Sequence, residues 1–111
     1  MKSSNSTILS IDTAQSSVTK VGITCNEHKK EYLLKTDSHR SQNLLPLIID
    51  SLQKESLSFS DITEIEVSCG PGSFTGTRVG VSIANALGWA LHIPVNGKSI
   101  AVPQYRSSKF D

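Results

Sequence analysis

The sequence of 111 residues predicts one small α/β domain with a mixed five-stranded sheet and two main helices. Three observations lead to this prediction. The first third of the chain holds short apolar runs that are separated by polar turns. Apolar residues then recur at helical spacing, and later a strand-like run leads through a glycine-rich turn into a long apolar segment.

The first three predicted strands form an antiparallel meander. They cover residues 8–11, 18–24 and 31–34, where β-branched and other apolar residues gather. Polar residues at 15–17 and 25–28 separate them, and connections this short join neighbouring antiparallel strands. We therefore expect three adjacent strands at one side of the sheet.

A helix is predicted next, because the period of the apolar pattern changes. The residues that define its apolar face are Leu44, Leu45, Leu47, Ile48, Ile49 and Leu52. Pro46 is tolerated if it falls in the first turn, where its missing N–H would have no intrahelical partner. Ser41 or Asn43 is then the expected N-cap.

The second half of the chain alternates strand and helix. Residues 64–68 predict a fourth strand, residues 77–91 predict a second helix that ends at 92–94, and Val95 begins a fifth strand. Three strands, helix, strand, helix and strand is the order of the ribonuclease H-like fold. The predicted domain covers residues 1–100, and residues 101–111 are expected to form a polar tail.

The turn before the second helix, Gly70-Pro71-Gly72-Ser73-Phe74-Thr75-Gly76, is the most distinctive segment. Strand, glycine-rich turn and helix is an order that presents backbone N–H groups to an anion or a partner. The motif is not a Walker A loop, because three residues separate Gly72 from Gly76 and Thr77-Arg78 stands where lysine and a hydroxyl residue are required. It is not a dinucleotide fingerprint, since Thr75 occupies the third glycine position. A purely structural turn remains the alternative.

Charge and cysteine content exclude several classes of function. Eleven Lys and Arg residues against ten Asp and Glu residues give a net charge of +1, without the basic clusters that autonomous nucleic-acid binding requires. We therefore expect no direct binding to nucleic acid. Cys25 and Cys69 lie far apart, which favours buried free thiols over a metal or redox motif. The polar start of the chain lacks the apolar run of a signal peptide, and no stretch is long enough to span a membrane, so we expect a cytoplasmic protein.

The second predicted helix carries more apolar surface than one sheet face needs. Val79, Ile83, Leu87 and Ala90 form one stripe, while small residues at Gly80, Ala84 and Gly88 lead to Leu91 on another side. Interior glycines cost helix propensity, and close helix contact would compensate for that cost. We therefore expect the two helices to dock a partner protein or a second copy. The residues predicted to make this contact are Leu44, Leu45, Ile48, Leu52, Gly80, Ala84, Leu87, Gly88 and Leu91. The alternative is that the groove is filled within the same chain, by the first helix or by Trp89 and the tail.

Three segments together resemble a known family. Ile8-Leu9-Ser10-Ile11-Asp12-Thr13-Ala14, His39 followed by Leu44-Leu45-Pro46, and the glycine-rich motif at 70–76 with Arg78 are similar to the TsaB (YeaZ) family of bacterial tRNA threonylcarbamoyladenosine biosynthesis proteins, also called glycoprotease-like. The motif with its arginine is the specific part of the resemblance. Members of the family usually have two domains, and the resemblance here covers only the first.

The resemblance implies a role without chemistry of its own. TsaB proteins are non-catalytic relatives of TsaD in the actin/hexokinase/Hsp70 superfamily. They support TsaD, which the ATPase TsaE joins, in transferring a threonylcarbamoyl group to N6 of adenine 37 in tRNA. The resemblance therefore implies TsaD-type and TsaE-type partners, with homodimerisation as a further expectation, and no cofactor.

The residues themselves favour the same interpretation. The turn after Asp12 has neither glycine nor lysine to hold phosphates, so Asp12 is expected to be a strand-end residue that bonds to nearby backbone or hydroxyl groups. His39 has no second histidine at helical spacing and predicts no metal site. No catalytic residue is predicted. The alternatives are an ATP-binding threonylcarbamoyl transferase, a glycoprotease-type enzyme, and a stand-alone homodimeric binding module.

Overall fold

The computed structural model describes residues 6–15, 18–35, 40–71 and 74–97. Three strands come first: β1 (Thr7–Asp12), β2 (Val18–Cys25) and β3 (His28–Lys35). They are followed by α1 (Arg40–Lys54), a short 3-10 helix η1 (Phe59–Asp61), β4 (Glu64–Val67) and α2 (Phe74–Leu91). The predicted boundary at residue 100 and the tail at 101–111 lie outside the described residues.

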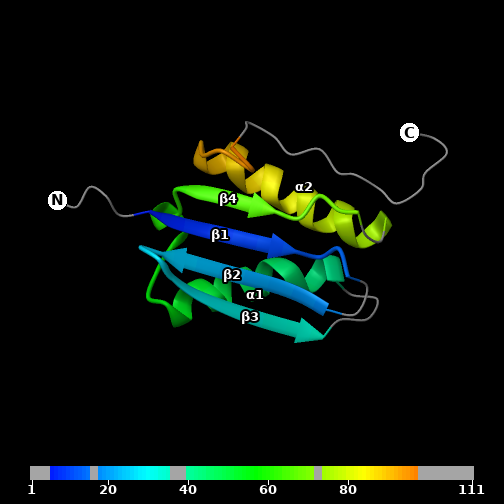
Figure 1. Ribbon diagram of the computed structural model, residues 1–111, viewed down its shortest axis with the longest axis horizontal. Helices are drawn as coiled ribbons and strands as arrows, with labels where there is room; N and C mark the ends of the chain where they lie inside the picture. Colours follow the sequence, from blue (N-terminus) through cyan, green and yellow to red (C-terminus); the bar gives the residue numbers. More distant parts are fainter. Residues whose placement is uncertain (1–5, 16–17, 36–39, 72–73, 98–111) are drawn as a thin grey trace.

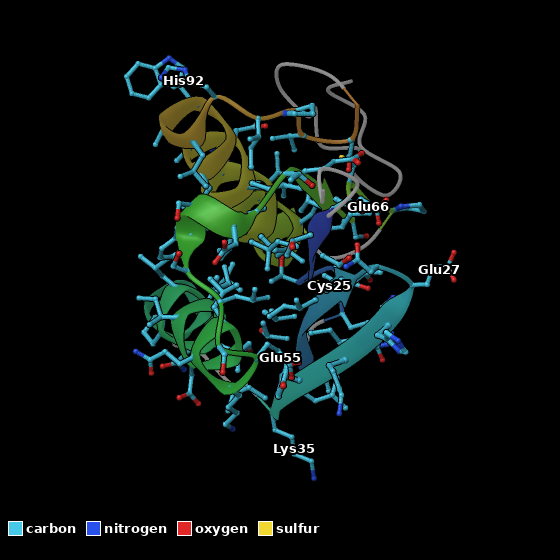
Figure 2. The ribbon with its side chains drawn as sticks, turned by 90° about the vertical axis from the view of Figure 1, so that its left-hand side faces the viewer. Cys25, Glu27, Lys35, Glu55, Glu66 and His92 are labelled. Atoms are coloured by element: carbon cyan, nitrogen blue, oxygen red, sulfur yellow. The ribbon has the colours of Figure 1, made fainter. Side chains whose placement is uncertain are left out.

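The strands form one mixed sheet in the order β3-β2-β1-β4 (Figure 1). The pairs β1–β2 and β2–β3 are antiparallel, which confirms the predicted meander, and β4 joins β1 in parallel. A two-residue turn at Asn26 and Glu27 links β2 to β3, and both residues have positive φ, as hairpins with such short loops prefer. Both main helices lie on the same face of this sheet (Figures 1 and 2).

The predicted fifth strand is reduced to one contact. Val95 makes a single parallel bridge with Ile65, so the sheet of the described residues has four strands and not five. Asn96 explains why pairing stops there, because its backbone turns to a φ of 53°. Its side-chain amide accepts a hydrogen bond from Val67 N (2.9 Å) and donates one to Val67 O (3.0 Å). A longer fifth strand would have to form its hydrogen bonds with this same N–H and C=O of Val67.

Both helices begin earlier than predicted. The α1 helix starts at Arg40, so Pro46 lies inside the helix beyond its first turn, and Ser41 and Asn43 are helical residues and not caps. An interior proline costs about 3 kcal/mol, and we attribute its tolerance to the packing of the buried α1 side chains against the sheet. The α2 helix starts at Phe74 and not at Thr77, so the last residues of the glycine-rich motif form its first turn.

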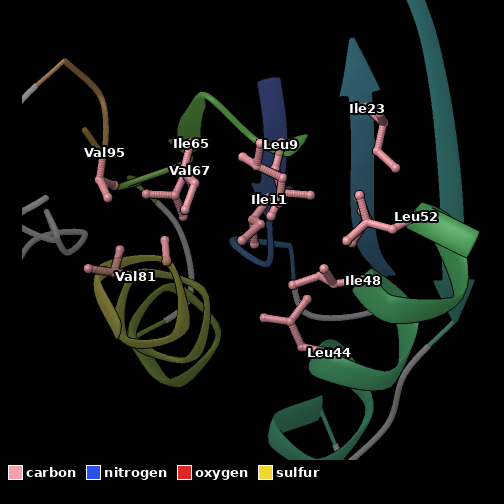
Figure 3. Close-up of a cluster of buried hydrophobic side chains, with 13 residues drawn as sticks. Leu9, Ile11, Ile23, Leu44, Ile48, Leu52, Ile65, Val67, Val81 and Val95 are labelled. Carbon is pink, nitrogen blue, oxygen red and sulfur yellow. The ribbon is translucent and has the colours of Figure 1, made fainter. Parts of the chain in front are cut away.

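The core lies between the sheet and the helix layer (Figure 3). Alternate residues of β1 and β4 point into it, as a sheet with one buried face requires. The buried apolar residues are Leu9, Ile11, Val21, Ile23, Leu44, Ile48, Leu52, Ile62, Ile65, Val67, Val81, Ala84 and Val95. Among the helices of the described ranges, none is long and apolar enough to cross a bilayer.

Candidate interaction site

The glycine-rich motif connects the central strands to the start of α2. After β4, the Ser68 N–H donates to Ile11 O (2.9 Å), and Gly70 takes a φ of 102° before a cis bond to Pro71. Only glycine adopts such a φ readily, which explains the residue at this position. Gly72 and Ser73 lie outside the described residues. Within the rest of the motif, Thr13 Oγ1 donates a hydrogen bond to Gly76 O, which ties the first turn of α2 to the end of β1.

Two polar side chains at this end of the sheet have different surroundings. Asp12 Oδ1 accepts a hydrogen bond from Ala14 N (3.0 Å), so the carboxylate closes its own turn, as the sequence predicted. Arg78, on the first turns of α2, is exposed. His39 lies outside the described residues. In the ranges that the structure does describe, no three His, Cys, Asp or Glu residues come together to hold a metal ion.

The small-residue stripe of α2 faces inward, which corrects the prediction that a partner helix occupies it. A Cβ atom added to Gly80 would lie 2.4 Å from Thr13 Oγ1, and one added to Gly88 would lie 2.4 Å from Val95 Cγ2. Ala84 between them is fully buried. The glycines therefore allow α2 to approach the end of β1 and Val95 closely, and residues of the same chain already fill the groove.

Of the predicted contact residues on α1, most are buried and only one is exposed. Leu44, Ile48 and Leu52 are buried against the sheet and are not available to a partner, so their assignment is also corrected. Leu45 is 40% exposed. On α2, Leu87 and Leu91 are half-buried and pack against the core. Of the predicted contact residues, Leu45, Leu87 and Leu91 therefore retain accessible surface.

Two exposed large apolar side chains of the described helices were missing from the predicted contact set. Ile49 on α1 is 39% exposed, and Trp89 on α2 is 80% exposed. Arg78, Ser82, Ala86 and Trp89 mark the solvent side of α2, at spacings of four, four and three residues. The sequence contains this spacing. It identifies the exposed side of α2 only if the polar residues, and not the glycines, are taken to face the solvent. We call Leu45, Ile49 and Trp89 the outer helix surface.

Other polar groups of the described residues serve the fold. Cys25 and Cys69 are free thiols, and both are half-buried, less completely than predicted. The Tyr32 hydroxyl on β3 donates a hydrogen bond to the Glu55 carboxylate just beyond α1. This hydrogen bond raises the pKa of Tyr32 above its usual value. Lys54 Nζ lies 5.5 Å from the centre of the same ring. This group joins the edge strand to the end of the helix beneath it.

Comparison with known proteins identifies the family. A family model described as TsaD, tRNA N6-adenosine threonylcarbamoyltransferase, matches residues 34–99. The TsaB protein of Bacillus subtilis is 32% identical over 93 residues, which are 84% of this chain and 41% of that protein. The TsaB protein of Escherichia coli is 39% identical over 59 residues, covering 53% of this chain and 26% of that protein.

A solved structure agrees with these matches. YeaZ from Pseudomonas aeruginosa superimposes with a TM-score of 0.77 at 29% identity, over 81% of this chain and 42% of the YeaZ chain. The chain thus spans less than half the length of each of these relatives. The chain belongs to the family described as TsaD, tRNA N6-adenosine threonylcarbamoyltransferase, and is a TsaB-like protein that matches the N-terminal part of its relatives, as its sequence motifs predicted.

Proposed function

We propose that this chain is a non-catalytic accessory subunit that binds a TsaD-type protein during threonylcarbamoyladenosine formation in tRNA. Relatives named for the biosynthesis of this modified nucleoside support the pathway. Because the chain spans less than half of those relatives, its partner and its mode of action are part of the proposal. TsaE-type association, homodimerisation, a cytoplasmic location and the absence of direct tRNA contact belong to the same proposal.

The outer helix surface is the single observation that most supports a protein partner. Trp89 exposes 80% of its surface on α2, and Leu45 and Ile49 expose about two fifths of theirs on α1. Both helices lie on one face of the sheet, so the three side chains belong to the same layer of the molecule (Figure 1). Tryptophan is enriched among residues that dominate binding energy in protein interfaces. A partner that covers Trp89 therefore gains a large apolar contact.

The surroundings of Asp12 support an accessory role over catalysis. In catalytic relatives of the superfamily this carboxylate position orients a metal-bound water, whereas here Asp12 accepts the Ala14 N–H. We further infer that the sheet and helix layer correspond to the N-terminal lobe of a ribonuclease H-like fold, because β3-β2-β1-β4 with a parallel β1–β4 pair fits that strand order.

Co-purification with TsaD from the same cell tests the proposal. We expect the tagged chain to retain TsaD, and Trp89→Glu to weaken binding by about 30-fold, the effect of losing a dominant interface residue. Leu33→Glu is the matched control, because Leu33 is an exposed apolar residue (62%) on the opposite face of the sheet. Failure to retain TsaD, or equal weakening by both substitutions, would contradict the proposal.

A second measurement addresses the enzymatic alternative. We expect titration with ATP and magnesium to give no binding by the isolated chain in the micromolar range. Micromolar affinity would favour the ATP-binding transferase and would contradict a purely accessory role. Asp12→Asn would then show whether the affinity depends on the carboxylate at the end of β1.

A further inference from the structure

The free edge of β3 offers unpaired backbone groups. Within the described sheet β3 has a neighbour on one side only, namely β2. Cys25 and His28 flank the two-residue turn and form the hydrogen-bonded pair that closes it, so the pairs alternate from there. By this alternation Lys29, Glu31, Leu33 and Lys35 direct their N–H and C=O groups away from β2. An edge of this kind is a template for an added strand.

A groove lies beside this edge, between β3 and α1. Its volume is about 520 Å³, and its apolar lining comes from Leu34, Pro46, Leu47 and Ile49. The lining of α1 extends from Asn43 to Gln53, which at 1.5 Å per residue is about 15 Å, the length of four or five strand residues. Figure 2 shows α1 beside β3. A strand added to β3 would turn alternate side chains toward this groove.

The charges of β3 indicate what kind of strand fits. Lys29, Lys30 and Lys35 outnumber Glu31 on this strand, and all four are exposed. Of these four residues, Lys29 and Glu31 form an ion pair with each other, with 3.5 Å between Nζ and Oε2. The excess of exposed lysines on this edge strand favours an acidic occupant, because opposite charges that face each other across a strand pair stabilise it.

We propose that an extended peptide segment pairs with the free edge of β3, with alternate apolar side chains in the α1 groove and acidic side chains facing Lys29 and Lys35. Backbone hydrogen bonds provide part of the affinity, while the groove and the lysines provide the specificity. The proposed site lies at the sheet edge, includes Ile49 from the outer helix surface, and does not depend on the proposed TsaD contact.

A synthetic peptide tests this site. Acetyl-Glu-Val-Thr-Val-Lys-Val-Glu, labelled with fluorescein, places its glutamates opposite Lys29 and Lys35, its lysine opposite Glu31 and two of its valines opposite Leu34 and Tyr32 when it runs antiparallel to β3. We expect fluorescence polarisation to detect binding by the full chain. The charge-reversed peptide, with lysines at both ends and glutamate in the middle, should bind about tenfold more weakly.

Leu33→Pro separates edge pairing from other contacts. Proline removes the outward N–H while the hydrogen bonds to β2 remain, which edge strands tolerate. We expect this variant to bind about tenfold more weakly, and Leu33→Thr, which keeps the N–H, to bind within about twofold of the original chain. Circular dichroism checks that Leu33→Pro is folded. If it is not folded, Ile49→Lys tests the groove contact without changing the strand, and we expect this variant to bind the peptide about tenfold more weakly, whereas unchanged binding would contradict the proposed site.

Three results would overturn the proposal. The first is no binding of the peptide at concentrations up to about 1 mM. A dissociation constant of that size corresponds to a binding free energy of only about 4 kcal/mol. The second is equal binding of both peptides, because the lysines would then not select the occupant. The third is concentration-dependent dimerisation that Leu33→Pro abolishes, because a second copy of the chain would then occupy the edge.

Discussion

The two edges of the sheet differ in how their backbone groups are satisfied. At the β4 edge, Pro94 and Asn96 bond to Ile65, and the Asn96 amide pairs with both the N–H and the C=O of Val67. At the β3 edge, lysine side chains are the main feature, and within the described sheet no further strand follows. Closing an edge from within the chain adds stability, whereas charges merely limit which strands can pair there. The comparison predicts that substitutions at the β4 edge affect stability and that those at the β3 edge affect binding.

Asn96→Ala is expected to have the largest effect. The substitution removes two hydrogen bonds to buried Val67 and places alanine at a φ of 53°, so we expect a loss of about 3 kcal/mol in the free energy of unfolding. Urea denaturation measures this loss. Asn96→Gly is the matched control, because it removes the same bonds without the backbone strain and should cost about 2 kcal/mol. A loss below about 0.5 kcal/mol for both variants would mean that Asn96 does not close the edge.

Gly88→Ala is expected to have the next largest effect. The new Cβ would lie 2.4 Å from Val95 Cγ2 and 3.1 Å from Ile93 O, so α2 or Val95 must move away from β4. Overpacking costs about 1 to 3 kcal/mol, partly offset by the better helix propensity of alanine, which leaves a net loss of about 1 to 2 kcal/mol. Thermal unfolding measures it. Ser82→Ala, on the exposed side of the same helix, should change stability by less than about 0.5 kcal/mol.

Tyr32→Phe is expected to have a smaller effect, at the open edge. The hydrogen bond to Glu55 raises the pKa of the Tyr32 hydroxyl in the folded state. A raised pKa means that this contribution to stability is complete below the unfolded pKa of about 10 and is lost as the pH rises through the folded pKa. We therefore expect the substitution to lower the urea midpoint slightly at pH 7 and to weaken its alkaline dependence. An identical decline of both proteins between pH 9 and 11 would contradict this assignment.

Leu33→Thr is expected to have the smallest effect on stability. Leu33 is 62% exposed on the face of the sheet away from the helices, and threonine suits a strand as well as leucine does. We expect the free energy of unfolding to change by less than about 0.5 kcal/mol in urea denaturation. A loss above 1 kcal/mol would show that this side chain packs against another part of the chain, and the β3 edge would then not be open.

The sequence predicted the strands well, because local rules decide them. The runs around Leu9, Val21 and Ile65 form strands, and the polar turn at Asn26 and Glu27 fixes the meander. The helix starts were less predictable. At α2 the structure extends the helix back into the glycine-rich motif as far as Phe74, a position at which neither propensity nor the apolar period marks a beginning.

The candidate contact surface was predicted only in part, because it depends on how each helix is rotated against the sheet. Gly80 and Gly88 at a spacing of eight residues fit either a partner helix or the sheet of the same chain. The distinction rests on Thr13, which is far from α2 in sequence, and on Val95, which meets Gly88 because the chain turns back after α2. Trp89, on the opposite side of the helix, is therefore exposed.

The position of β1 has a consequence for the order in which the molecule assembles. This strand is made first, yet its parallel neighbour arrives late, as the hydrogen bond from Thr7 N to Thr63 Oγ1 spans 56 residues of chain. The hairpins with β2 and β3 close over short loops, whereas the β1–β4 pair must wait for a long loop to close, which slows folding. During synthesis the meander therefore forms a partial sheet in which one edge of β1 stays unpaired until β4 follows.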